Sequence, residues 1–336
     1  MGNQCTGKKK YQFSNAINST DCFFKFRQKK KLYRLDDRLG FQDINDEAMI
    51  QISEQILKEC LNSQKLKLEL SINKIGNPGL ISLGEAISQC INLKELNLDL
   101  GANKYDQNGA KQFCNYLSKC RELTSLTLSF DQYQHAEFPL QDEDFKNIQE
   151  SLQQLEHLTY LNLKLSYNVI KDGAKHLGQL ISKLNKLESF AFDLRQSQLT
   201  NQGLIGIVDG IIANPSKFIK INLQLEYNSI HQESAIRLGQ AIPMCQNLVE
   251  LRLYLKANRV GVNGTQQIGI GIGQCPNLKM FHLEFMYSHF GEEGFILLAR
   301  GFSRSKSLVQ FSLDNWQMIS KQNFDYLQDN IQQENN

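Results

Sequence analysis

Hydrophobic and polar residues alternate in nine short segments that recur along the chain. Each segment reads LxLxL or a close variant, and the first apolar residues are Leu66, Leu96, Leu126, Leu161, Phe190, Ile221, Leu251, Phe281 and Phe311. Successive segments start 30, 30, 35, 29, 31, 30, 30 and 30 residues apart. Alternation with a period of two predicts a strand with one buried face. A spacing held over nine rows predicts a solenoid in which each row packs against its neighbours.

The second row shows the elements of one repeat. Apolar residues alternate from Leu96 to Leu100, and Asn103 follows the predicted strand. Beyond the asparagine the apolar spacing becomes four, four and three residues, at Gly109, Phe113, Leu117 and Cys120. This spacing predicts a helix with one apolar stripe. Neither element buries its apolar face alone, so we expect strand–helix units that stack into a continuous α/β core.

Two segments of this pattern resemble a known repeat family. LKELNLDLGANKYDQNGAKQF and LTYLNLKLSYNVIKDGAKHL are similar to leucine-rich repeats of the ribonuclease-inhibitor type, and the resemblance covers roughly residues 60–315. It implies a horseshoe solenoid with parallel strands on the concave face, helices on the convex face and protein recognition as the usual task. The family pattern normally reads LxxLxLxxNxL, whereas this chain reads LxxLxLxLxxN. The longer pattern predicts an extra strand pair in each row.

Polar and small residues also recur at fixed places in the repeat. An amide follows the strand at Asn73, Asn103, Asn168, Asn228 and Asn258, and Ser197 and Ser288 replace it in two rows. We expect these side chains to bond the turning backbone of neighbouring rows. Gly84, Gly178, Gly239 and Gly269 each lie twelve residues before a strand start, where a small residue lets helix and sheet approach closely. The glycine run at 269–273 is therefore interpreted as structural and not as a dinucleotide-binding loop.

The positions of the cysteines favour a structural column in the repeat, and a set of disulfides is the less favoured alternative. Five of them, Cys60, Cys90, Cys120, Cys245 and Cys275, each lie six residues before the next strand start. Equivalent positions stack in a solenoid, so we expect a core column of free thiols that act as small apolar residues. The chain contains no CxxC pair, which disfavours zinc. Free thiols are typical of a reducing compartment.

Charge and pattern divide the chain into four predicted segments. Residues 1–40 form a basic, disordered or lipidated arm, 41–65 an N-terminal cap helix, 66–315 the solenoid, and 316–336 a C-terminal capping helix with a polar tail. The arm contains ten Lys or Arg and three Asp, a net charge of +7, so the other residues sum to −5 against the total of +2. This asymmetry indicates that the arm has a binding partner of its own.

The first residues match a lipidation pattern. Residues 1–6 fit M-G-x-x-x-[ST], with Gly2 as the acceptor of a myristoyl group, and Cys5 is a candidate for palmitoylation. One acyl chain binds membranes only marginally, so a second signal is needed. The lysines supply one electrostatically, at Lys8, Lys9, Lys10, Lys29, Lys30 and Lys31. We expect attachment to an anionic cytoplasmic membrane; an ordinary basic tail, a nuclear-localisation signal and packing of 22–34 on the first cap are the alternatives.

Strand residues between the buried leucines point away from the core and form the predicted concave face. Their mixed charges disfavour a nucleic-acid groove. The candidate partner-binding residues are Arg252, Tyr254, Lys256, His282, Glu284 and Met286, with Tyr167, Tyr227 and Tyr287 at strand exits. Tyr, Arg and Met are enriched at protein interfaces. Plain exposed ladder residues are the alternative, and the five-residue insertion within 131–144 is either a binding loop or neutral.

These patterns predict a non-enzymatic scaffold or adapter that binds a protein partner at a membrane surface. No HExxH, P-loop, kinase or GxSxG motif is found, so we expect no metal, no cofactor and no small-molecule substrate. A catalytic site assembled across rows is the less favoured possibility. The alternative function is regulation of a small GTPase, because Ran GTPase-activating proteins share this repeat class, or inhibition of another enzyme.

Overall fold

The computed structural model describes residues 43–134 and 136–314, together with the backbone of four short strands nearer the N-terminus. These four are β1 (Gln12–Asn15), β2 (Asp21–Cys22), β3 (Phe24–Gln28) and β4 (Lys31–Leu32). The sequence pattern did not predict them. β1, β3 and β4 form a small antiparallel sheet, whereas β2 pairs in parallel with β5 (Lys65–Glu69). Part of the arm therefore extends the main sheet at its first row.

One parallel sheet runs through all nine predicted rows. Its further strands are β6 (Glu95–Asp99), β7 (Ser125–Ser129), β8 (Tyr160–Lys164), β9 (Ser189–Asp193), β10 (Lys220–Gln224), β11 (Glu250–Tyr254), β12 (Met280–Glu284) and β13 (Gln310–Asp314). Each strand pairs only with the rows before and after it in the chain. The register joins equivalent residues, so that Leu66 lies beside Leu96 and Leu251 beside Phe281. The strand starts predicted from the period are confirmed.

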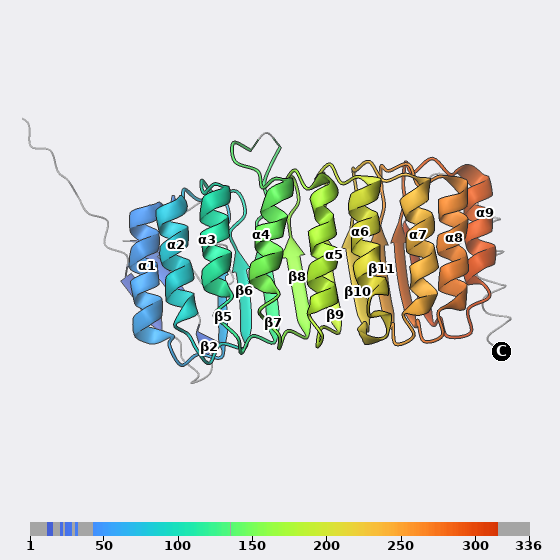
Figure 1. Ribbon diagram of the computed structural model, residues 1–336. Helices are drawn as coiled ribbons and strands as arrows, with labels where there is room; N and C mark the ends of the chain where they lie inside the picture. The colour runs from blue at the N-terminus through green and yellow to red at the C-terminus, as the bar shows by residue number, and fades with distance from the viewer. Residues whose placement is uncertain are drawn as a thin grey trace, which may run out of the picture.

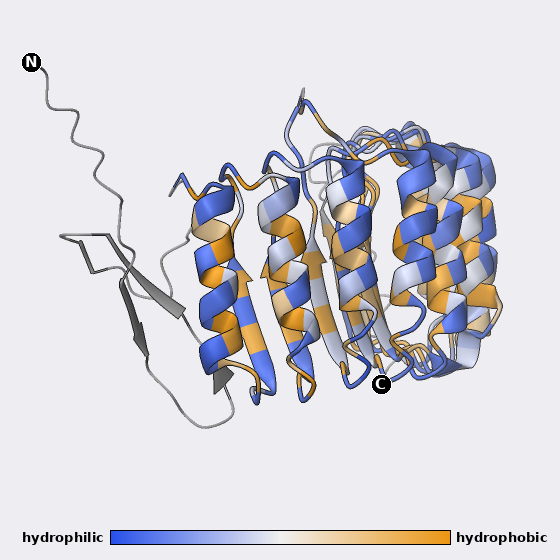
Figure 2. Cartoon of the chain, turned by 60° about the vertical axis from the view of Figure 1, so that its left-hand side comes forward, coloured by the Kyte–Doolittle hydropathy of each residue, from blue (hydrophilic) through white to orange (hydrophobic). Residues whose placement is uncertain are grey.

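Nine helices in the described residues form a second layer. They are α1 (Asp46–Glu59), α2 (Asn77–Ser88), α3 (Gln107–Leu117), α4 (Asp142–Leu152), α5 (Ala174–Lys183), α6 (Asn201–Ile212), α7 (Gln232–Ala241), α8 (Gly261–Gln274) and α9 (Gly291–Phe302). They stand side by side in chain order on one side of the sheet (Figure 1). Each carries both hydrophobic and hydrophilic residues, as expected of helices between a core and solvent (Figure 2).

The spacing of the two layers places the sheet on the inner side of the curve. Parallel strands lie about 4.8 Å apart, whereas packed helices need about 8–10 Å. Equal numbers of strands and helices stack together only if the helices lie on the longer, outer arc. The predicted horseshoe, with strands on the concave face and helices on the convex face, follows from this difference.

The extra strand pair predicted from the lengthened repeat is present as backbone hydrogen bonds. After β5 ends, Leu70 N–H donates to the Asp99 carbonyl at 2.7 Å, and Ile72 N–H donates to the Gly101 carbonyl at 2.8 Å. The same two bonds join later rows, for example from Leu255 and Ala257 to the eighth row. The ladder therefore continues past the strand exits, and two more side chains per row follow the concave surface.

Asparagines close five of the rows, as predicted. Asn103 donates to the carbonyls of Leu70 and Leu100, both at 2.9 Å, and its Oδ1 accepts from Ile75 N–H at 3.1 Å. One side chain thus bonds two successive rows. Where serine replaces the amide, Ser288 Oγ donates to the Leu255 carbonyl at 2.8 Å. Row three has no such residue, and its insertion forms a loop that leads into α4 (Figure 1).

The glycine column does not join helix to sheet, and that part of the prediction is wrong. A Cβ on Gly178 would overlap the Gly206 carbonyl of α6, and one on Gly269 would overlap the Leu298 carbonyl of α9. The close approach is therefore between neighbouring helices. The run at 269–273 lies inside α8, where Gly271 and Gly273 pack against the flanking helices. A continuous helix has no loop to surround a phosphate. The position of the run inside α8 therefore agrees with a structural role and not with dinucleotide binding.

Four residues of the cysteine column are buried free thiols, as predicted: Cys90, Cys120, Cys245 and Cys275. Burial raises the pKa of Cys90 to about 11 and those of Cys120 and Cys245 to about 12, so these thiols stay protonated and unreactive. Cys60 departs from the prediction because it is disulfide-bonded. It lies at the N-terminal end of the column, where no earlier row supplies an equivalent residue, and its partner is outside the described side chains.

Candidate protein-binding face

The surface of the sheet that the helices leave uncovered is here called the strand face. It consists of the side chains that alternate with the buried leucines, from Lys65 in the first row to Ser312 in the ninth. Most are partly or fully exposed, while the residues between them are buried. Several pair across rows, as Lys65 does with Glu95 at 3.1 Å and Lys220 with Glu250 at 3.2 Å. The face is thus a polar ladder with charges of both signs.

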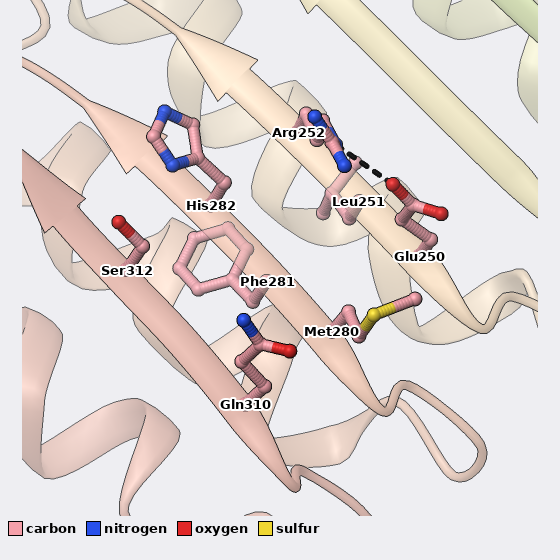
Figure 3. Close-up of a pocket in the computed structure, with 8 residues that line it drawn as sticks. All are labelled: Glu250, Leu251, Arg252, Met280, Phe281, His282, Gln310 and Ser312. Atoms are coloured by element: carbon pink, nitrogen blue, oxygen red, sulfur yellow. Dashed lines mark hydrogen bonds and ion pairs between the residues drawn. The ribbon is translucent and has the colours of Figure 1, made fainter.

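Residues from the seventh and eighth rows form the centre of the predicted binding set. The register places Arg252 beside His282 and Tyr254 beside Glu284. The Tyr254 and His282 rings lie 4.7 Å apart between centroids. Arg252 Nε donates to Glu250 Oε1 at 2.7 Å, and its guanidinium remains half exposed (Figure 3). The ion pair holds the arginine on the surface without covering it. Burial raises the pKa of Glu250, but the hydrogen bonds from Lys220 and Arg252 outweigh burial, so the pKa is lowered.

A shallow pocket opens beside this cluster. Glu250, Arg252, His282 and Ser312 line it, with Met280 at one end (Figure 3). Its volume is about 140 Å³. Cavities that hold drug-sized ligands measure about 300–1,000 Å³. The pocket therefore suits one inserted side chain better than a free small molecule.

The remaining predicted residues adjoin this cluster at the strand exits. Lys256 Nζ lies 5.6 Å from the centre of the Tyr227 ring and 3.9 Å from Glu284 Oε1. The Met286 carbonyl accepts from Ala257 N–H at 2.7 Å. The structure thus brings Arg252, Tyr254, Lys256, His282, Glu284, Met286 and Tyr227 into one continuous patch.

The three exit tyrosines share one backbone position. Tyr167, Tyr227 and Tyr287 have φ of 59°, 56° and 57°, and each directly precedes the residue that closes its row. Ile72, Ala102, Gln196 and Ala257 have the same conformation in other rows. The left-handed turn directs the chain from strand to helix. Tyr227 and Tyr287 remain 49% and 60% exposed, but they lie two rows apart and do not form one cluster.

Acidic side chains occur at the same edge and were not part of the predicted set. Arg195 makes a two-pronged ion pair with the buried Asp193, in which Nε donates to Oδ1 at 2.8 Å. Glu226 is 8% exposed, and burial raises its pKa to about 7. Asp131, in the row-three insertion, accepts from Ser166 N–H and Oγ at 2.7 and 2.8 Å. The signal was available, because Asp131, Arg195 and Glu226 occupy the extra position that the lengthened repeat adds.

The predicted lipid anchor lies outside the described residues. Gly2, Cys5, Lys8, Lys9, Lys10, Lys29 and Lys30 fall there, and of Lys31 only the backbone is described, in β4. The predicted C-terminal capping helix at 316–336 is likewise outside. No helix among the described residues is long and apolar enough to cross a bilayer. Nor do three or more His, Cys, Asp or Glu side chains of the described ranges gather as metal ligands.

Comparisons with known proteins add little beyond this geometry. No protein-family model matches the sequence, and no curated protein matches it. Among solved structures it is similar to an internalin from Listeria monocytogenes, at 14% sequence identity and a TM-score of 0.36, over 76% of this chain and 74% of that one. The assignment therefore rests on the repeat, the parallel register and the single helix layer. By these features the chain is an α/β leucine-rich-repeat solenoid.

Proposed function

We propose that this protein is a non-enzymatic scaffold or adapter, of the ribonuclease-inhibitor-like type, that binds a protein partner on its strand face. One observation carries the proposal: Arg252, Tyr254 and His282 form a packed, half-exposed patch in the concave centre of the C-terminal rows. Aromatic and arginine side chains in such a position are typical of binding hot spots. The small pocket beside them supports recognition of side chains on a protein surface.

Partner capture followed by mass spectrometry tests the face. The double variant Arg252→Glu with Tyr254→Ala reverses one charge and removes one ring at the patch centre. We expect it to lose the partners that the wild-type protein retains. Arg300→Glu is the matched control, because this exposed arginine lies on α9 in the helix layer. Retention of every partner by the double variant would disprove the proposed face.

We further propose that acylation of Gly2 and Cys5, with the basic arm, holds the scaffold at a cytoplasmic membrane. The motif and the arm's net charge of +7 support this. The five buried free thiols of the described residues agree with a reducing compartment, whereas the bonded Cys60 does not. Membrane fractionation of cells should show that Gly2→Ala moves the protein to the soluble fraction. Gly7→Ala leaves the motif intact and should stay in the membrane fraction. Equal partitioning of the two variants would refute acylation.

Regulation of a small GTPase stays the alternative form of this activity. It requires a measurable change in GTP turnover by one member of a GTPase panel when the protein is added. A partner captured through the strand face whose turnover is unchanged would favour the plain scaffold.

A further inference from the structure

The sixth row presents two hydrogen-bond acceptors on the strand face that have no donor. They are Asn222 Oδ1 and Glu226 Oε2, both almost without solvent contact. The two residues lie four positions apart on the same side of one row, separated by Gln224 and the buried leucines. A buried acceptor without a donor destabilises the folded protein, and a charged acceptor does so more strongly. Buried polar groups in folded proteins almost always have a hydrogen-bond partner, so these two exceptions require an explanation.

The surroundings of Glu226 are predominantly negative. Burial is the main cause of its raised pKa, and Asp193 and Glu284 raise it further, whereas its own backbone N–H and Arg195 lower it. The Arg195 guanidinium is already engaged, because Nε and Nη2 both donate to Asp193. The carboxylate of Glu226 therefore lies in an acidic site whose nearest arginine serves another residue.

The lysine of the next row does not pair with the Glu226 carboxylate. Lys256 occupies the position equivalent to Glu226 in the next row, but its Nζ lies over the Tyr227 ring and near Glu284. Lys164, on β8, is level with Gln224 in the register, and the whole of β9 lies between the two residues. The exposed Tyr227 ring follows Glu226 directly and can accept a second cation on its face.

We propose that Glu226 receives a cationic side chain, lysine or arginine, of the protein partner, with Asp193 and Glu284 on either side and Asn222 accepting a second donor from the same partner segment. This inference rests on the proposed function, and names the chemistry of the partner: a basic, extended segment that crosses rows five to eight. Charge-assisted bonds to a desolvated carboxylate are among the stronger contacts that an interface offers. The exit tyrosines then form the aromatic edge of the site.

Selection from a phage-displayed library of random peptides of about twelve residues tests the proposal on the full chain. Peptides selected on the wild-type protein should carry lysine or arginine at one fixed position. For such a peptide, Glu226→Gln should raise the dissociation constant at least tenfold in calorimetry. Glu150→Gln, an equal change on an exposed glutamate of α4, should leave it unchanged. A thermal melt of each variant confirms that it is folded.

A change in the peptide gives a second measurement that leaves the protein intact. Replacing the selected lysine by norleucine, or the selected arginine by citrulline, should weaken binding to wild type but not to Glu226→Gln. Selection of acidic or apolar peptides, or equal binding by both proteins, would overturn the inference. If the peptides lose binding to the Arg252/Tyr254 variant while ignoring Glu226→Gln, the scaffold function stands and only this inference fails. If they ignore every strand-face substitution, both fail.

Discussion

Buried polar side chains at the strand exits have two opposite roles. Asn258 is inside the solenoid, and its amide donates to the carbonyls of Leu225 and Leu255 at 2.8 and 3.1 Å. Glu226 lies only two residues before the equivalent Asn228, yet its Oε2 has no donor. The first kind of residue satisfies the backbone where two rows turn. The second kind has an acceptor for which the described residues supply no donor, and we therefore interpret it as functional.

The ladder asparagines should be essential to stability. Asn103→Ala leaves Ile75 N–H without its acceptor and the carbonyls of Leu70 and Leu100 without a donor. Each buried unsatisfied group costs about 1–3 kcal/mol, so we expect a loss of about 2–4 kcal/mol in the free energy of unfolding. Urea denaturation measures it. Asn108→Ala, at an exposed site early in α3, should change stability by no more than about 0.5 kcal/mol; equal effects of the two would contradict the ladder role.

Glu226 should make stability depend on pH in an unusual direction. Its folded pKa is about 7, above the ordinary value of 4.5, because burial and the charges of Asp193 and Glu284 outweigh its backbone hydrogen bond and Arg195. Between these values the folded state holds the proton and the unfolded state releases it. The contribution of Glu226 is therefore most favourable below about pH 4.5 and is lost as the pH rises through 7.

Replacing this carboxyl tests the sign. Glu226→Gln should equal wild type near pH 4 and exceed it by on the order of 3 kcal/mol near pH 8, when the protein is free of partner. Urea denaturation across that range gives the comparison. A wild-type advantage that grows with pH would show that Glu226 is stabilised as the anion.

The helices of neighbouring rows are matched to each other through glycine. Gly178 on α5 faces Gly206 and Gly210 on α6, and Gly239 on α7 faces α8 in the same way. Backbone then touches backbone, which shortens the distance between helices and lowers the mismatch with the strand spacing. The composition of the helix layer thus helps to set the curvature of the strand face.

Gly178→Ala tests this packing between elements. Alanine favours the helix by about 1 kcal/mol over glycine, but its Cβ would overlap the Gly206 carbonyl. Overpacking typically costs 1–3 kcal/mol. We expect net destabilisation of about 1–2 kcal/mol by thermal or urea unfolding. Gln179→Ala, exposed on the same helix, should stay within about 0.5 kcal/mol, and a stabilised Gly178→Ala protein would show that the helices separate freely.

At the element level, the sequence predicted where the strands begin better than it predicted which elements pack against each other. The period located every strand start, because alternating leucines must share one core. It could not tell that Gly178 faces a helix, since a small residue is required equally by either neighbour. The strand-face patch at Arg252 and His282 followed from register alone. Glu226 was missed because its proposed role rests on a buried acceptor without a donor. That is a property of three-dimensional contacts, which the spacing of residues does not encode.

Across the whole molecule, stability should be local. Each strand pairs only with adjacent rows, and α1 to α9 follow the same order. In such a solenoid, stability is roughly a sum of row terms and neighbour terms. The strand face can therefore yield in one region while the remaining rows hold their shape.

A cavity in the fourth row measures how far rows are coupled. Leu163 on β8 is 1% exposed, and Leu163→Ala should cost about 2–5 kcal/mol. Because the contacts run only to adjacent rows, amide hydrogen exchange should accelerate most in β7, β8 and β9 and decline toward both ends. Leu68→Ala, at the equivalent site of the first row, should confine the change to the N-terminal rows. Acceleration of equal size from β5 to β12 in either variant would instead mean that the solenoid opens as one cooperative unit, and a partner bound at β11 and β12 would then stabilise every row.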